Sequence, residues 1–114
     1  MLSGYFQGIG ACGEVIVSTY QSETEDFLDH KKTGMLELVS LMGNISMDDS
    51  GSPLLHSHAS FSYLNDTDEP AIIGGHLTKA TVLYTAEITI VPVNNEIGRM
   101  IDPLTGINVW KFNH

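Results

Sequence analysis

Strand-like runs separated by short turn sequences constrain the fold of this chain most strongly. Four runs are rich in apolar, β-branched and aromatic residues: 13–21, 35–47, 54–64 and 80–93. Such residues favour strands, and the Gly, Pro, Asn, Asp and Ser residues between them favour turns. Because short turns join antiparallel neighbours, the pattern predicts a mainly antiparallel sheet with little helix.

The segments between the runs carry few helical signals. Segment 22–34 is polar, and it could form one turn of helix or an extended connection ending at Gly34. The N-terminal segment is short and contains glycines. DDSGSP (48–53) and NDTDEP (65–70) are turns by composition. Gly43 interrupts the second run, which indicates a bulge or a close backbone approach, with Asn44 supporting the bulge.

Three histidines supply the visible chemistry. His56 and His58 are two residues apart in a strand-like run, so their side chains point to the same face. His76 opens the next run after a Gly-Gly pair that favours a strand-entry bend. If the two runs form an antiparallel hairpin, the third imidazole approaches the first two. Three neutral imidazoles can hold zinc or a similar divalent metal and leave a position open for water or a ligand.

A structural role for the same histidines stays open. Two half-buried imidazoles hydrogen-bonded to their neighbours would give the same H-x-H pattern. Glu87 follows His76 by an odd number of residues, so we expect a surface carboxylate facing away from the site. His30 and His114 stand in polar or terminal contexts and are expected to be exposed.

Length and composition favour one globular domain covering residues 1–114. The chain is 42% hydrophobic and 17% charged, and no apolar run reaches the length of a membrane span. Its single cysteine, Cys12, can form no internal disulfide. A cytoplasmic location is therefore expected, with Cys12 as a buried, inert thiol.

The charge balance disfavours direct DNA binding by the isolated chain. Five Lys and Arg residues stand against fourteen Asp and Glu residues, which gives a net charge of −9. DNA-binding proteins use basic side chains to displace counterions from phosphates. The only adjacent basic pair, Lys31-Lys32, is expected to lie in a solvated turn, and no Arg-Gly-Arg core of an AT-hook occurs.

Six segments together resemble the PPC domain (plants and prokaryotes conserved), which stands alone in prokaryotes and beside AT-hooks in plants. The matching segments, in the order of the family, are 3–17, 37–46, 55–62, 74–77, 85–90 and a closing pattern of Arg99, Asp102, Thr105 and Gly106. The resemblance covers nearly the whole chain.

The resemblance implies an α+β fold with a mainly antiparallel sheet, assembled as a homotrimer. It also implies a shortened N-terminus, because family members begin with a strand and a helix before the segment that starts here at residue 3. Prokaryotic members often keep the positions of His56, His58 and His76. A related fold includes an acetolactate decarboxylase with a similar zinc arrangement, which is an analogy and transfers no reaction.

Three functions remain open from the sequence. The first is a small oligomeric binding or regulatory domain with a three-histidine metal site and a small-molecule ligand. The second is a metal-dependent lyase or hydrolase, which would need a general acid or base near the metal. The third is a DNA-associated protein whose contacts come from another subunit or partner.

Overall fold

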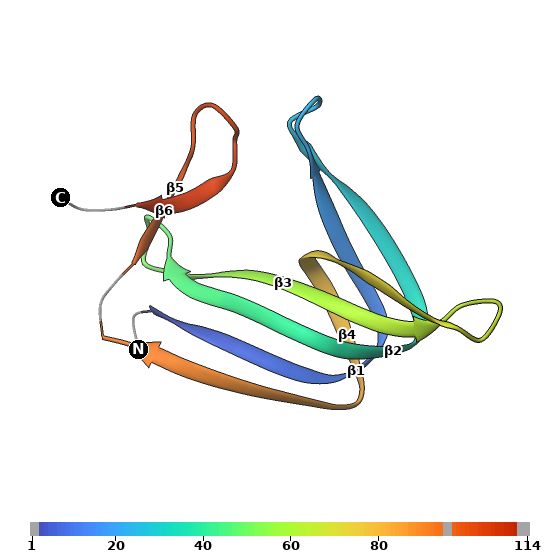
Figure 1. Cartoon of the computed structure of the whole chain (residues 1–114). Helices are drawn as coiled ribbons and strands as arrows, with labels where there is room; N and C mark the ends of the chain where they lie inside the picture. Colours follow the sequence, from blue (N-terminus) through green and yellow to red (C-terminus); the bar gives the residue numbers. More distant parts are fainter. Residues whose placement is uncertain (1–2, 95–96, 112–114) are drawn as a thin grey trace.

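The computed structural model describes residues 3–94 and 97–111, which form one six-stranded sheet (Figure 1). The strands are β1 (Ser3–Gln21), β2 (Asp26–Met47), β3 (Pro53–Leu64), β4 (Pro70–Val93), β5 (Gly98–Ile101) and β6 (Asn108–Lys111). Long strands joined by short turns are what the composition predicts. No helix long and apolar enough to cross a membrane occurs among these residues.

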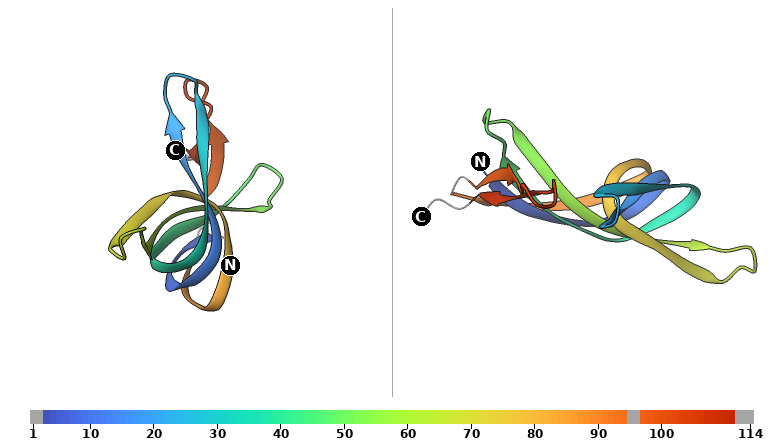
Figure 2. Two further views of the ribbon diagram at one scale, coloured as in Figure 1. Left: turned by 90° about the vertical axis from the view of Figure 1, so that its right-hand side faces the viewer. Right: turned by 90° about the horizontal axis from the view of Figure 1, so that it is seen from above.

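The first four strands close into a ring. β1 pairs with β2 and β4, and β3 pairs with the same two strands, all of them antiparallel. The short β5–β6 hairpin joins β2 through one parallel pair, Met47 with Gly98, so the sheet is mixed. Figure 2 shows how strongly the long strands coil, with the β1–β2 turn and the β5–β6 hairpin standing up on the same side.

The predicted antiparallel sheet is confirmed, but the helical part of the α+β expectation is wrong: the described residues form an all-β fold. Residues 22–25 form a turn, and β2 starts at once at Asp26. Lys31 and Lys32 therefore lie in a strand, and β2 continues through Gly34. The N-terminal segment forms the first half of β1, because its glycines let the backbone of β4 approach closely. A Cβ on Gly4 would lie 2.6 Å from the carbonyl oxygen of Val91.

Gly43 marks a close approach and not a bulge. It pairs in regular register with β1 and β3, and the irregularity of the β2–β3 pairing lies between Leu38 and Ser40. The Phe6 ring occupies the space that a side chain on Gly43 would need. Support of a bulge is therefore not the role of Asn44.

Both predicted turns are present, and each is organised by its first polar side chain. Asp48 accepts hydrogen bonds from the backbone N–H groups of Ser50 and Ser52. Asn65 does the same for Thr67 and Glu69. These turns close the β2–β3 and β3–β4 hairpins.

The core lies inside the ring of strands. Val15, Val17, Leu36 and Phe61 are completely buried there, with Leu38, Leu41, Ala59 and Cys12 packed beside them. Burial raises the pKa of the Cys12 thiol, as expected for an inert residue. Burial of each large apolar side chain contributes about 1.5–3 kcal/mol to folding.

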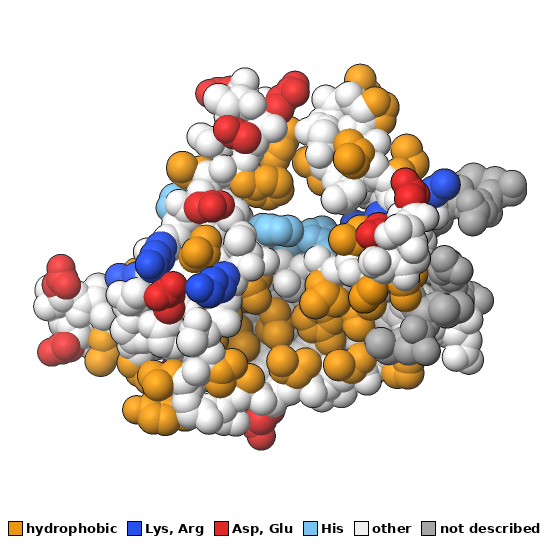
Figure 3. All heavy atoms as spheres, turned by 180° about the vertical axis from the view of Figure 1, so that it is seen from behind, with side chains coloured by type: hydrophobic (Ala, Val, Ile, Leu, Met, Phe, Trp, Pro, Cys, Tyr) orange, Lys and Arg blue, Asp and Glu red, His pale blue; other side chains and the backbone are white. Residues whose placement is uncertain are grey.

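The second half of β4 lacks such cover. Every residue from 78 to 90 is exposed, and the apolar ones on this stretch include Val82, Tyr84, Ile88 and Ile90. β4 pairs with β1 along this stretch, while its pairing with β3 ends at His76. Figure 3 shows apolar side chains spread over the face of the molecule below the histidines. An apolar surface of this kind is unusual for a free monomer.

Candidate metal centre

The structure brings the three predicted histidines together. His56 and His58 project from one face of β3, and His58 lies directly opposite His76 on β4. The ring centroids are 5.1 Å apart for His56 and His58, 5.4 Å for His56 and His76, and 5.6 Å for His58 and His76. The predicted antiparallel hairpin is therefore confirmed, and each imidazole faces the other two.

Two glycines before His76 make this placement possible. At this point β4 lies between β3 and β1, and His76 pairs with His58 on one side and Ser18 on the other. A Cβ on Gly74 would lie 2.9 Å from the carbonyl oxygen of Ala59, and one on Gly75 would lie 2.8 Å from that of Ser18. The Gly-Gly pair therefore lets both neighbouring backbones approach. It lies inside β4, so the expected bend at the entry to a strand is wrong.

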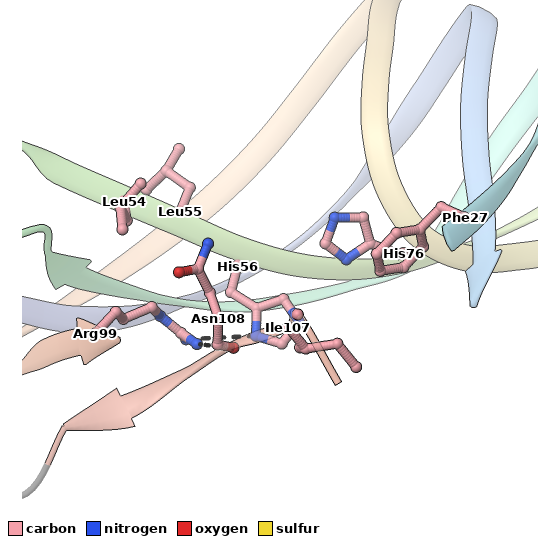
Figure 4. Close-up of a pocket in the computed structure, with 9 residues that line it drawn as sticks. Phe27, Leu54, Leu55, His56, His76, Arg99, Ile107 and Asn108 are labelled. Carbon is pink, nitrogen blue, oxygen red and sulfur yellow. Dashed lines mark hydrogen bonds between the residues drawn. The ribbon is translucent and has the colours of Figure 1, made fainter. Parts of the chain in front are cut away.

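The histidines lie between the β1–β2 hairpin and the β5–β6 hairpin, which both project from the long strands. In Figure 3 histidine side chains (pale blue) are visible in the hollow between the two groups of atoms that stand up from the molecule. On one side, the Phe27 ring at the start of β2 lies 5.2 Å from the His76 ring. On the other side, Arg99 from β5 reaches His56 (Figure 4). The two hairpins thus partly shield the cluster from water.

Arg99 is a buried cation beside the cluster, with a relative exposure of 6%. Its Nε donates to the Ser46 hydroxyl at 2.8 Å, and one terminal nitrogen donates to the Asn108 carbonyl oxygen at 3.3 Å. The other terminal nitrogen lies 3.3 Å from Nδ1 of His56. Burial lowers the pKa of Arg99, but a guanidinium remains charged at neutral pH.

Burial favours the neutral form of His56 and His76. It lowers the pKa of His56, and the charge of Arg99 and the neighbouring histidines lower it further. Burial and the nearby His58 also lower the pKa of His76. A metal binds the neutral form of imidazole, which has a free lone pair. The lowered pKa values therefore favour the form of His56 and His76 that can bind a metal.

The residues fit a divalent metal. One ligand nitrogen from each of the three histidines lies within 4.8 Å of the other two. Nitrogens bound tetrahedrally to one zinc ion, each about 2.1 Å from it, are about 3.4 Å apart. Small side-chain rotations cover the difference, and three protein ligands leave a position open.

One polar atom beside the cluster lacks a hydrogen-bond partner within the described part of the chain. This atom is Oδ1 of Asn44, which is buried. Asn44 pairs with His56 across β2 and β3, so both side chains stand on the same face. An acceptor in this position suits an imidazole N–H or a polar ligand, which also agrees with a binding site.

The other predicted side chains lie away from the cluster. Glu87 is exposed and pairs with Ile9, as expected for a surface carboxylate. His30 is exposed on β2, and His114 lies outside the described residues. Sequence reasoning missed the roles of Arg99 and Phe27. The only signal for Arg99 was its place in the closing family pattern, and Phe27 had none.

A cavity of about 250 Å³ opens beside the histidines. Figure 4 shows His56 and His76 at its wall, with Arg99 at one end and Phe27 at the other. The remaining lining is mostly apolar, from Leu54, Leu55, Gly106, Ile107 and Asn108. An apolar cavity with a few converging polar groups is typical of a small-molecule site.

A family model described as the Plants and Prokaryotes Conserved (PCC) domain matches residues 2–94. This chain belongs to the PCC domain family. The predicted resemblance is thereby confirmed, and β1 to β4 with the three histidines fall within the matched part of the PCC domain. No protein of curated function matches the chain.

Solved structures share the fold of this PCC domain. A protein from Bacteroides thetaiotaomicron, described as a candidate DNA-binding protein, is 28% identical with a TM-score of 0.88; the match covers 98% of this chain and 75% of that one. A metal-containing protein from Archaeoglobus fulgidus is 28% identical with a TM-score of 0.84 and coverages of 96% and 74%. A plant- and prokaryote-conserved protein from Pyrococcus horikoshii is 27% identical with a TM-score of 0.81 and coverages of 98% and 74%.

Proposed function

We propose that this PCC domain is a metal-dependent binding module, in which His56, His58 and His76 hold zinc or a similar divalent cation. The mutual approach of one nitrogen from each imidazole to within 4.8 Å is the observation that carries the proposal. Imidazole ligands favour zinc among the common divalent ions. The printed description of the Archaeoglobus relative as metal-containing gives further support.

Elemental analysis of protein purified without a metal-affinity tag tests this proposal. We expect about one zinc or similar ion per chain for a complete three-histidine site. His56→Ala and His76→Ala should lose the ion, while His30→Ala, at an exposed position of β2, should keep it. Folded wild-type protein that contains no metal and takes up none from added zinc would refute the proposal.

A binding role is favoured over an enzymatic one by the groups around the histidines. Acid–base catalysis on a metal-bound water needs a carboxylate or similar group within hydrogen-bond reach. No Asp or Glu is found among the described residues that line three cavities touching the cluster. A lyase or hydrolase activity is therefore the weaker proposal.

Direct DNA binding is also the weaker proposal, although the Bacteroides relative carries that description. Of the basic side chains, Arg99 is buried, Lys31 pairs with Glu14 at 3.7 Å, and Lys32 lies over the Tyr63 ring. Lys79 and Lys111 remain exposed on β4 and β6, so the described surface offers few free cations to follow a phosphate backbone. The net charge of −9 also disfavours binding to DNA, which is negatively charged.

Assembly as a homotrimer completes the proposal. The exposed apolar stretch of β4 between residues 78 and 90 supports self-association, because a partner subunit would remove it from water. The choice of a trimer over a dimer comes from the family resemblance.

A further inference from the structure

We infer that the cavity between Arg99 and the histidines binds a small organic carboxylate with a short apolar body. The inference rests on the proposed metal site and names the class of ligand that the site takes. Arg99 supplies the charge for the carboxylate, and Leu54, Leu55 and Ile107 supply the apolar wall.

The first argument is the charge of Arg99, for which the described residues provide no carboxylate partner. Arg99 is almost fully buried, yet no ion pair joins it to a carboxylate within residues 3–94 and 97–111. Its three hydrogen-bond partners, Ser46, Asn108 and His56, are neutral groups. A buried cation is costly unless an anion accompanies it. Two of its five N–H groups also remain beyond these three contacts.

The second argument concerns the lone pairs of His56. A neutral imidazole has one lone pair, and the contact at 3.3 Å uses it if Arg99 donates to Nδ1. A metal on Nδ1 would take this lone pair directly. A metal on Nε2 would leave the hydrogen on Nδ1, which then cannot accept. Metal binding through either nitrogen therefore ends this hydrogen bond and frees an N–H of Arg99 close to a second positive charge.

An anion in the cavity would balance the buried charge of Arg99 and accept a hydrogen bond from its released N–H group. A carboxylate has two oxygens whose planar fork matches the guanidinium group. It would neutralise Arg99 and accept the N–H that metal binding releases. Metal and carboxylate should consequently bind cooperatively, each raising the affinity of the other by the same factor.

The shape of the cavity selects the body of the ligand. Its volume of about 250 Å³ lies just below the usual range for drug-sized ligands, roughly 300–1,000 Å³. Apart from Arg99, the histidines and Asn108, its described lining side chains are apolar. A short aliphatic carboxylate fits these properties better than inorganic phosphate, which has no apolar part.

Butyrate and its uncharged isostere butyramide are suitable probes for the full chain, with and without zinc. We expect butyrate to shift the NMR signal of the Arg99 Nε–H group, and zinc to tighten its binding. Arg99→Gln should weaken butyrate binding by about ten- to a hundredfold, the usual effect of losing charged hydrogen bonds. Ile107→Phe keeps the charge but fills the cavity, so it should also weaken binding.

The outcomes separate this inference from the proposed metal site. Equal binding of butyramide and butyrate, preference for inorganic phosphate, or binding that leaves the Arg99 signal unmoved would overturn the carboxylate site. Zinc binding with no butyrate binding to either form overturns the carboxylate site alone. Butyrate binding to a protein that never takes up zinc overturns the metal site and the cooperativity, while the Arg99 subsite stands.

Discussion

His58 and His76 are directly opposed residues of the antiparallel strands β3 and β4, with ring centroids 5.6 Å apart. His56 reaches the same point because it lies two residues before His58 on the same face. The site therefore depends on one hairpin register. A slip by one residue would move the side chains of one strand to the opposite face.

Zinc should stabilise the folded protein, because it binds a site that the unfolded chain lacks. At a free zinc concentration 100 times the dissociation constant, the free energy of unfolding should rise by about 2.7 kcal/mol. His58→Ala should lose most of this gain, and His30→Ala should retain it. Chemical denaturation with and without zinc measures the difference. An equal gain in both variants would contradict a site at His58.

Substitution of Gly74 should disturb the strand contacts that position His76. Gly74→Ala places a Cβ about 2.9 Å from the carbonyl oxygen of Ala59, so we expect a loss of about 1–3 kcal/mol in the free energy of unfolding, together with weaker zinc binding. Gly13→Ala is the matched control, because its nearest neighbour, Cβ of Leu83, would lie 3.8 Å away. Comparable losses in the two variants would show that close packing at Gly74 is not the cause.

Stability of the metal-free protein should decrease on acidification below the normal histidine pKa. Burial lowers the pKa of His56 and His76 in the folded state, while the unfolded value is about 6.5. Between about pH 6.5 and the lowered pKa values of the folded state, the unfolded state binds more protons. The free energy of unfolding therefore decreases as the pH is lowered through this window. Urea denaturation across this pH range should show the decrease, and the double variant His56→Ala/His76→Ala should flatten it. A wild-type protein equally stable throughout would contradict the shifts.

The histidine cluster was predictable because its determinants are local. The H-x-H spacing defines one face of a strand, and the turn at 65–70 brings His76 back opposite His58. Strand alternation and a hairpin connection are sufficient for this geometry. The all-β character was less accessible, because the polar segment 22–34 carries neither a helical stripe nor strand alternation, and its conformation follows from pairing with β1.

Arg99 illustrates what sequence patterns could not provide. It is 43 residues from His56 along the chain, and its strand β5 meets β2 at a single parallel pair, Met47 with Gly98. Hydrophobic periodicity carries no information about so small a long-range contact. The charge of Arg99 is visible in the sequence, but its burial beside the imidazoles is a property of the folded chain only.

The isolated domain should bind duplex DNA negligibly at physiological salt. Tight binding needs several Lys or Arg side chains on phosphates, and each such contact contributes to the salt dependence. Lys31 of β2 and Lys79 of β4 both lie opposite Ile16 of β1. However, Lys31 pairs with Glu14, Lys32 lies over the Tyr63 ring, and Lys111 is on β6, so few cations are left for phosphates. Fluorescence anisotropy with labelled DNA at about 0.15 M salt measures this. Tight binding that weakens steeply with added salt would reveal a basic surface created by assembly.

The exposed stretch of β4 leads to a prediction about assembly. Ile88 and Ile90 are about half exposed, and they pair with Gly8 and Phe6 of β1. Full burial of one such side chain contributes about 1.5–3 kcal/mol, so covering several of them can hold subunits together. Ile88→Glu would place a carboxylate in that interface, where its desolvation opposes association. The wild type should therefore have three times the mass of one chain in light scattering at micromolar concentration, and Ile88→Glu should approach the monomer mass.

Leu104→Glu is the control, because this leucine is 84% exposed on the β5–β6 turn and away from β4, so this variant should remain trimeric. A wild type of monomer mass would refute self-association, and an Ile88→Glu trimer would move the interface to another surface.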